Sequence, residues 1–345
     1  MDAPRQEAVP VRVGIIGGGW VATARHIPAF RRDRRTRIVG IADRTASRAA
    51  AVARRFGIAV HTTRWPELCG QVDLVSICTP PWTHAAMTIE ALSRGCHVLV
   101  EKPMATSTDD AVAMQTAAVA AGRHLCVAHN FLFARSVQKA LALVAAGRLG
   151  SVRTVFAHQW SSPRRRLPTW YEQLPGGLFY DEAPHMVYLI RAFLGDLTVL
   201  AASTRSAGAG RADSVSSRFA GRHGEATLEM IFGSPLSEWV MAVIGSEGAV
   251  LLDLFRDICV VLGSDHGHRA IDVLRTSLSA MAQHTGGVIA SGWRLLGGRL
   301  SFGHHRLVRM FVDSVLGFRP LPVSAGDGLA VVRVLDAILQ EASRP

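Results

Sequence analysis

The chain has 345 residues, more than one hydrophobic core usually organises, so we expect two domains. Hydrophobic residues make up 49% of the sequence, but no apolar run approaches the roughly 18 residues of a membrane span, and the polar N-terminal stretch does not resemble a secretory signal. The formal net charge of +11 would suit a nucleic-acid partner, yet the basic residues form short separate groups without interleaved aromatic residues, so we expect no nucleic acid.

The first predicted element, residues 11–16, is a buried strand that ends at a glycine-rich turn. The turn fits the pattern G-x-G-x-x-A, and residues 21–30 can continue it as a helix. Such glycines let the backbone approach a pyrophosphate, which then lies at the N-terminus of the helix. The motif makes six residues candidates for cofactor binding: Gly17, Gly18, Gly19, Trp20, Val21 and Ala22.

A second strand, residues 37–42, ends in Asp43, which follows Ala22 by 21 residues. An acidic side chain at this spacing can accept hydrogen bonds from the adenosine ribose hydroxyls and would repel a 2′-phosphate. We therefore expect NAD as the cofactor, with NADP as the alternative because the adjacent Arg44 could receive that phosphate. Asp43 could also cap the helix predicted over residues 46–56, and the two roles are compatible.

Strands and helices then alternate, which predicts a parallel, doubly wound sheet. Thr79 and Pro80 end a buried strand sharply, and Thr83 is placed to open the next helix. The further elements expected in this half are strands at residues 72–78, 97–100 and 125–128, and helices at 84–94 and 107–121.

Glu101 and Lys102 follow directly after the strand at residues 97–100, at the edge where open α/β sheets bind ligands. The chain contains 36 arginines and only two lysines, so an ammonium group has been kept at this position in a sequence that otherwise uses Arg. An ammonium can lower its pKa and donate as a compact point, which a guanidinium cannot do. The alternative is a solvated pair of charges at a strand end.

The second half begins with a helix at residues 137–146 and continues as strands joined by short glycine-bearing turns, which favours a largely antiparallel sheet. We place the boundary near Asn130, giving domains of residues 1–130 and 131–345. The strands are expected at residues 152–159, 198–204, 214–219, 226–232, 238–244 and 250–255, and the last helices at 306–316 and 328–341.

Asp181 and His185 are four residues apart, so they share a face if that stretch is helical. The carboxylate could then orient the imidazole or a substrate. The alternative is a helix-capping Asp with an interior His whose hydrogen bonds are satisfied.

The motifs together resemble those of the Gfo/Idh/MocA oxidoreductase family, over residues 11 to about 342. The resemblance implies an N-terminal Rossmann domain, a second α/β domain with a large, open, mainly antiparallel sheet, and an active site in the crevice between them. The motifs are Gly17 to Ala22, the strand ending in Asp43, Ile77-Cys78-Thr79-Pro80, Glu101-Lys102-Pro103 and Gly176-Gly177-x3-Asp181-x3-His185.

By this resemblance His185 is the proton acceptor, Lys102 holds the substrate hydroxyl on the nicotinamide side, and Asp181 orients them. No metal site is implied. The residues that would line the cofactor by the same resemblance are Thr79, Pro80, His84, Glu101, Lys102 and Asn130. His84 could equally cap its own helix.

The sequence departs from the family pattern near His185. The family commonly has Gly where Ala183 stands and an acidic residue where Tyr188 stands, which puts the polar contacts of His185 in question. Phe131, where the family often has Arg, predicts a less charged pocket floor. Three consecutive arginines, Arg164, Arg165 and Arg166, could grip a phosphate or carboxylate of the substrate, or form a solvated loop.

We therefore predict a cytoplasmic NAD(P)-dependent oxidoreductase that acts on a secondary hydroxyl or ketone of a sugar, cyclitol or sugar-derived substrate. The substrate class comes only from the resemblance, and the cytoplasmic location from five cysteines that lack disulfide or metal-ligand spacing. The alternatives are redox-neutral, NAD-dependent glycoside cleavage and a non-catalytic, cofactor-binding regulator.

Residues 270–302 are the least family-like part of the chain. Ile271, Leu274, Leu278 and Met281 recur at helical spacing, and a second apolar group around Trp293 follows after Gly286-Gly287, with Arg294 and Arg299 beside it. We expect two short amphipathic helices that pack on the second domain, form a homo-oligomer contact or, least favoured, touch an anionic membrane.

Overall fold

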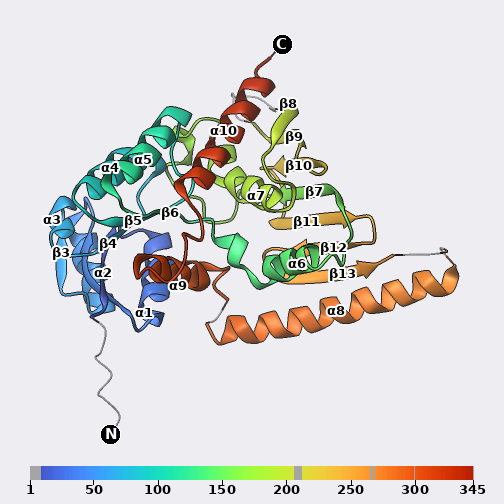
Figure 1. Ribbon diagram of the computed structural model, residues 1–345, viewed down its shortest axis with the longest axis horizontal. Helices are drawn as coiled ribbons and strands as arrows, with labels where there is room; N and C mark the ends of the chain where they lie inside the picture. The colour runs from blue at the N-terminus through green and yellow to red at the C-terminus, as the bar shows by residue number, and fades with distance from the viewer. Residues whose placement is uncertain (1–8, 206–211, 265–266, 268, 299, 345) are drawn as a thin grey trace, which may run out of the picture. The chain divides into compact units, whose positions relative to one another are not determined.

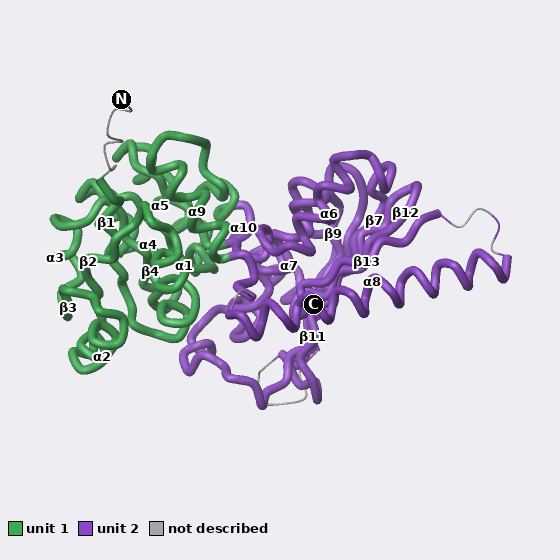
Figure 2. The backbone as a smooth tube through the Cα atoms, turned by 90° about the horizontal axis from the view of Figure 1, so that it is seen from below, with its two compact units in different colours: residues 1–128, 304–329 green, residues 129–303, 330–345 purple. Residues whose placement is uncertain are grey.

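The computed structural model describes residues 9–205, 212–264, 267, 269–298 and 300–344, so the polar residues 1–8 and Arg299 lie outside the described part. The chain forms two compact units (Figure 2). Unit 1 comprises residues 1–128 and 304–329, and unit 2 comprises residues 129–303 and 330–345. Among the described helices, none is both long and apolar enough to span a membrane.

Unit 1 is built on a six-stranded parallel sheet with the order β3-β2-β1-β4-β5-β6 (Figure 1). Its strands are β1 (Val11–Ile16), β2 (Thr36–Ala42), β3 (Val60–Thr62), β4 (Leu74–Ile77), β5 (His97–Val100) and β6 (Leu125–Val127). Its helices are η1 (Ala22–His26), α1 (Ile27–Arg32), α2 (Ala46–Phe56), α3 (Pro66–Cys69), η2 (Pro81–Thr83), α4 (His84–Ser93), α5 (Thr108–Ala121) and α9 (His304–Val315). The doubly wound parallel sheet is thereby confirmed.

Local sequence signals explain where these elements begin and end. All four residues of β4 are buried, as a parallel strand covered on both faces requires. Helix α2 ends at Gly57, whose φ of +62° suits glycine at the position after a helix. Ser107 caps α5 by accepting a hydrogen bond from the backbone of Asp110 at 3.2 Å.

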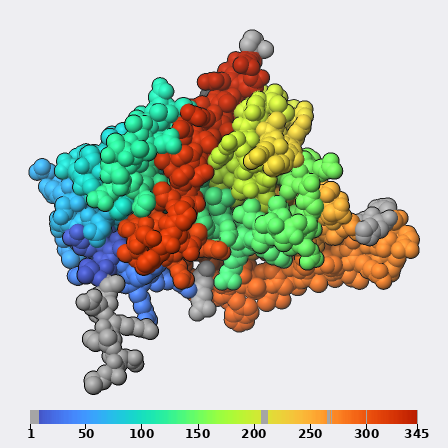
Figure 3. Space-filling model, viewed as in Figure 1, coloured from blue at the N-terminus to red at the C-terminus, as the bar shows by residue number. Residues whose placement is uncertain are grey.

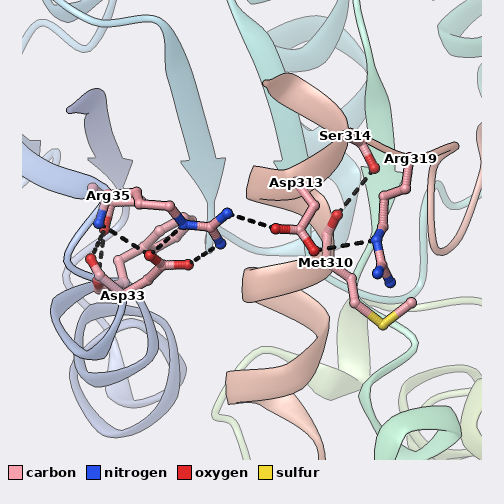
Figure 4. A network of polar contacts seen from close by, with 8 residues as sticks. Asp33, Arg35, Met310, Asp313, Ser314 and Arg319 are labelled. Carbon is pink, nitrogen blue, oxygen red and sulfur yellow. Dashed lines mark hydrogen bonds and ion pairs between the residues drawn. The ribbon is translucent and has the colours of Figure 1, made fainter. Parts of the chain in front are cut away.

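Residues 304–329 belong to unit 1, although the sequence assigned everything after residue 130 to the second domain. Leu307 and Phe311 of α9 are fully buried. On the same helix Asp313 accepts a hydrogen bond from Arg35 at 2.6 Å and lies 3.1 Å from Arg319 (Figure 4). Arg35 also binds Asp33 at 2.7 Å. Contacts between such distant parts of the sequence leave no local pattern. A single boundary near residue 130 therefore could not assign these residues to the first domain.

Unit 2 is built on a seven-stranded sheet with the order β13-β12-β11-β7-β10-β9-β8, antiparallel except between β7 and β10. This confirms the mainly antiparallel sheet. Its strands are β7 (Val152–Trp160), β8 (Thr198–Arg205), β9 (Ser214–Ala220), β10 (Glu225–Ile231), β11 (Glu238–Gly245), β12 (Gly248–Asp253) and β13 (Ile258–Gly263). The helices of unit 2 are η3 (Asn130–Phe133), α6 (Arg135–Ala145), η4 (Tyr171–Gln173), α7 (Leu178–Leu194) and α8 (Ala270–Leu296). Helix α10 (Ala325–Ala342) begins in unit 1 and continues in unit 2.

Helix α8 is one continuous helix of 27 residues, so the prediction of two short helices separated by Gly286-Gly287 was wrong. A Cβ atom at Gly287 would lie 2.8 Å from the side chain of Ile258 in β13, so the missing side chain lets the helix approach the strand. Gln283 adds two hydrogen bonds of 2.9 Å to the backbone of Val261 in β13. These contacts offset the roughly 1 kcal/mol that each glycine costs inside a helix.

Candidate active site

In unit 1, three predicted cofactor segments follow three neighbouring parallel strands. The glycine turn follows β1, Thr79 and Pro80 follow β4, and Glu101 follows β5. Because β4 lies between β1 and β5 in a parallel sheet, all three segments come to the same edge. The strand order reverses between β1 and β4, which is where open α/β sheets bind nucleotides.

The glycine turn has the geometry that a dinucleotide requires. Gly17 has a φ of +94°, and a Cβ atom there would lie 2.8 Å from the carbonyl oxygen of Cys78, so only glycine fits. A Cβ atom at Gly19 would meet nothing within 4 Å, which leaves open space where a phosphate could approach the backbone. Ala22, the last residue of the motif, is fully buried and begins η1. The residues present therefore fit a bound pyrophosphate.

Asp43 is buried, and its carboxylate links the glycine turn to the start of α2. Its two oxygens accept hydrogen bonds of 2.8 Å from the backbone N–H groups of Gly18 and Thr45. The capping role considered for Asp43 is thus present in part, since Thr45 is the residue before α2. Arg48 lies 3.5 Å from the carboxylate, and Arg44 is exposed.

Glu101 is held by a buried network that the sequence did not reveal. Its Oε1 lies 2.6 Å from Nε2 of His26, whose Nδ1 lies 2.8 Å from the hydroxyl of Ser76 in β4. Burial raises the pKa of Glu101, but the hydrogen bond and charge of His26 outweigh this and lower the pKa to about 2. Burial disfavours a charged His26, but the nearby Cys78 and Glu101 raise its pKa to about 10. The two groups therefore form an ion pair.

His304, at the start of α9, completes this network. Its ring lies 5.8 Å from that of His26. The side-chain atoms of His26, Glu101 and His304 that could bind a metal ion lie within 4.8 Å of one another. A metal ion would need atoms of His26 and Glu101 that already bind each other. We therefore interpret the cluster as an ion pair that fixes the Glu101 carboxylate.

His84 links two of the cofactor segments and is fully buried. Its ring nitrogens lie 2.9 Å from the carbonyl oxygens of Thr79 and Pro103. Burial lowers its pKa, whereas the two carbonyl oxygens oppose that shift. His84 therefore connects the backbone after β4 to the backbone after β5.

Lys102 is half-buried at the end of β5, and its backbone N–H donates to Oε2 of Glu101 at 3.1 Å. Both carboxylate oxygens of Glu101 are thus engaged, one by His26 and one by the backbone at Lys102. The ion pair thereby holds the turn that carries the lysine.

In unit 2, Asp181 and His185 lie in α7, so the conditional prediction of a shared helical face is met. Each retains less than a tenth of its exposed surface. Nδ1 of His185 lies 2.8 Å from the hydroxyl of Tyr188, and that hydroxyl accepts a hydrogen bond of 3.1 Å from the backbone of Phe131. Tyr188 thus supplies a polar partner at the position where the family commonly has an acidic residue.

Aromatic rings surround His185 on several sides. The ring of Phe131 lies 5.2 Å from that of His185 in an edge-on arrangement, and the ring of Trp239 lies at 5.2 Å. Phe131 and Trp239 are themselves 5.7 Å apart. Phe131 and Trp239 thus pack aromatic rings against His185, while Tyr188 supplies its polar partner.

Glu182, which the sequence did not single out, is a buried carboxylate with three polar neighbours. Gln159 donates to its Oε2 at 2.5 Å, Ser161 donates at 2.7 Å, and Arg165 forms an ion pair with Oε1. Burial lowers the pKa of Arg165. Arg165 is therefore already paired with a protein carboxylate, while Arg164 and Arg166 are exposed.

Asn130 is buried at the start of η3, and its side-chain amide donates to the carbonyl of Phe302 at 2.8 Å. This bond ties the beginning of unit 2 to the end of its long central segment. Like His84, Asn130 therefore has a structural partner that the sequence did not suggest.

Comparisons with known proteins agree with this arrangement. Residues 11–129 match the model of an oxidoreductase family with an NAD-binding Rossmann fold, and residues 137–251 match the GFO/IDH/MocA C-terminal domain. The crystal structure of GenD2 from gentamicin A biosynthesis, in complex with NAD, is similar with a TM-score of 0.79 and 25% identity, covering 99% of this chain and 97% of that one.

Two curated relatives have sugar substrates in their names. The chain is 32% identical to dTDP-3,4-didehydro-2,6-dideoxy-alpha-D-glucose 3-reductase of Streptomyces violaceoruber, over 73% of this chain and 76% of that protein. It is 31% identical to D-glucoside 3-dehydrogenase of Escherichia coli (strain K12), over 54% of this chain. The matched region spans 54% of that second relative, about half its length.

Proposed function

This chain belongs to the GFO/IDH/MocA oxidoreductase family, and we propose that it transfers a hydride between NAD and a secondary hydroxyl or ketone of a sugar or cyclitol. The observation that carries the proposal is the meeting of the glycine turn, Thr79 and Glu101 at one edge of the parallel sheet. Related proteins named as sugar reductases and dehydrogenases support the substrate class.

We assign the cofactor to unit 1. Gly17 lets the turn pass close to the carbonyl of Cys78, and Gly19 leaves open space for the pyrophosphate. Asp43 offers a buried carboxylate to the adenosine ribose. When bound, the nicotinamide ring of NAD accepts or supplies the hydride. A carboxylate at this position opposes a 2′-phosphate, so we propose NAD over NADP.

We assign the proton and the substrate oxygen to Lys102, Asp181 and His185. Lys102 is the donor that holds the oxygen, because an ammonium is compact and carries three N–H bonds. His185 takes the proton at Nε2, which requires Nδ1 to carry its own proton and to donate to the hydroxyl of Tyr188. Tyr188 can accept it, because its oxygen has two lone pairs and Phe131 uses one. Asp181 orients these groups.

We also propose a cytoplasmic location and a homo-oligomer formed through unit 2. All five cysteines are free and buried, as a reducing compartment permits. Substrate binding is proposed to rely on hydrogen bonds and aromatic contacts near His185, because Arg165 already has Glu182 as an ion-pair partner.

The experiment begins with mass spectrometry of any nucleotide that co-purifies with the protein. A panel of glycosides, nucleotide sugars and inositols is then screened by the absorbance of reduced nicotinamide, with His185→Asn as the matched inactive control. Turnover that requires His185 supports the proposal. Bound NAD without turnover of any substrate supports a regulator, and product formation without a net absorbance change supports redox-neutral chemistry.

A further inference from the structure

Helix α8 leaves an unusually apolar surface exposed. Ten of the 21 exposed large hydrophobic side chains in the described part of the chain belong to this one helix. Trp293 is 72% exposed and Leu296 81%. Of the helix residues, only Ser291 is buried. The ten are Ile271, Val273, Leu274, Leu278, Met281, Val288, Ile289, Trp293, Leu295 and Leu296.

The side of α8 that faces its own unit is the polar and small-residue side. Gln283 binds the backbone of Val261, Gly287 lies against Ile258, and Arg294 is 3.8 Å from Asp257. At 3.6 residues per turn these three helix positions share one side. Leu274, Leu278 and Met281 project from the opposite side, so the apolar stripe points away from β13.

The stripe has the repeat of a helix–helix seam. Starting at Ile271, its positions are separated alternately by three and four residues along the whole helix, which is the heptad spacing that lets two helices pack side chains into each other. The positions are Ile271, Leu274, Leu278, Met281, Thr285, Val288, Gly292 and Leu295. Thr285 and Gly292 are small and would permit close approach of a second backbone.

The stripe is comparable in size to the largest apolar patches of monomeric proteins, which are often functional. A helix of 27 residues is about 40 Å long and about 10 Å wide, so the stripe covers roughly 400 Å² in projection and more over its side chains. Monomers rarely expose more than a few hundred Å² of contiguous apolar surface. In Figure 3, as in Figures 1 and 2, α8 (orange in Figures 1 and 3) lies at the margin of unit 2.

We propose that the outward stripe of α8 is an interface with α8 of a second copy of this chain. A symmetric pair presents the same surface twice, so each apolar stripe meets an identical one. Helices that lie on membranes carry many Lys and Arg on their polar face, whereas here that side packs on β13 and its Arg294 is directed to Asp257. The charge distribution therefore favours a second chain over a lipid surface.

The test compares the mass of wild-type protein with that of Leu278→Glu/Met281→Glu, by analytical ultracentrifugation over a range of concentrations. The matched control is Thr276→Glu, an exposed position on the other side of the same helix. We expect the wild type to sediment at no less than twice the 37.1 kDa of one chain, the double variant at half the wild-type mass, and the control like the wild type.

A milder pair, Leu274→Ala/Leu278→Ala, covers the case in which the charged variant does not fold, since Ala favours a helix. Each lost leucine should weaken association about tenfold. A monomeric wild type, or variants that associate as tightly as the wild type, would overturn the proposal. Co-sedimentation of a monomeric wild type with vesicles of phosphatidylcholine and phosphatidylglycerol would assign the stripe to a membrane surface instead.

Discussion

Replacing His26 by Leu removes one partner of the buried ion pair while leaving the other in place. The side chains of His26 and Glu101 retain 1% and 9% of their exposed surface, so almost no water can replace the lost partner. Breaking such a pair typically costs about 3–5 kcal/mol, because an uncompensated charge stays buried. The hydroxyl of Ser76 would also lose its imidazole partner. Unit 1 should therefore be strongly destabilised.

For a unit of this size, each kcal/mol lowers the melting temperature by about 2–4 °C, so the transition of unit 1 should fall by roughly 6–20 °C in differential scanning calorimetry. His61→Leu is the matched control, because His61 is exposed on β3 of the same unit and its loss should change stability by less than about 0.5 kcal/mol. Adding Glu101→Gln to His26→Leu removes the buried charge and should restore part of the loss.

The destabilisation should also depend on pH in a defined direction. The pKa of His26 is raised from 6.5 to about 10, so its contribution to stability is complete below 6.5 and is lost as the pH rises towards 10. The difference between wild type and His26→Leu should therefore shrink between about pH 6.5 and about pH 10. A loss below about 1 kcal/mol, or a loss independent of pH, would show that no ion pair exists here.

Four further outcomes are expected. Asp43→Ser should move the ratio of NAD to NADP efficiency towards NADP, and a wild type that prefers NADP about tenfold would contradict our assignment. Lys102→Arg should retain NAD in calorimetric titration but lower turnover roughly a hundred-fold, since charge is kept and shape is not. Tyr188→Phe should lower kcat with little change in KM, because only the proton transfer by His185 loses support; an equal loss in thermal stability and activity would point to packing instead. Gly19→Val should weaken NAD binding without lowering the melting temperature, because its side chain enters open space.

The nucleotide-binding half followed closely from the sequence, because its signals are local. The glycines after β1, the Asp after β2 and the Glu-Lys pair after β5 all sit where strand ends could be identified from short apolar runs. Strands β3 and β13 were not predicted. β3 has three residues and no fully buried one, so it lacks the apolar pattern of the others.

The partners of the site residues were harder to predict, because they depend on distant contacts. His26 and Glu101 are 75 residues apart, and nothing in the local sequence around His26 indicates a carboxylate partner. The low helix propensity of Gly286 and Gly287 predicts an interruption of the helix. In the structure the helix continues, because the missing side chain of Gly287 lets it pack closely against Ile258. Tyr188 was recognisable only as a departure from the family pattern, and its hydrogen bond to His185 appears only in three dimensions.

The return of residues 304–329 to unit 1 has a consequence for synthesis of the protein. When Ala128 leaves the ribosome, the segment that contains α9 is still separated from it by 175 residues of unit 2. At about 5–20 residues per second this delay lasts roughly 9–35 s. During it, the surface of unit 1 that later receives Leu307 and Phe311 is exposed to other nascent chains and chaperones. Unit 1 can therefore complete its core only after nearly all of unit 2 has been translated.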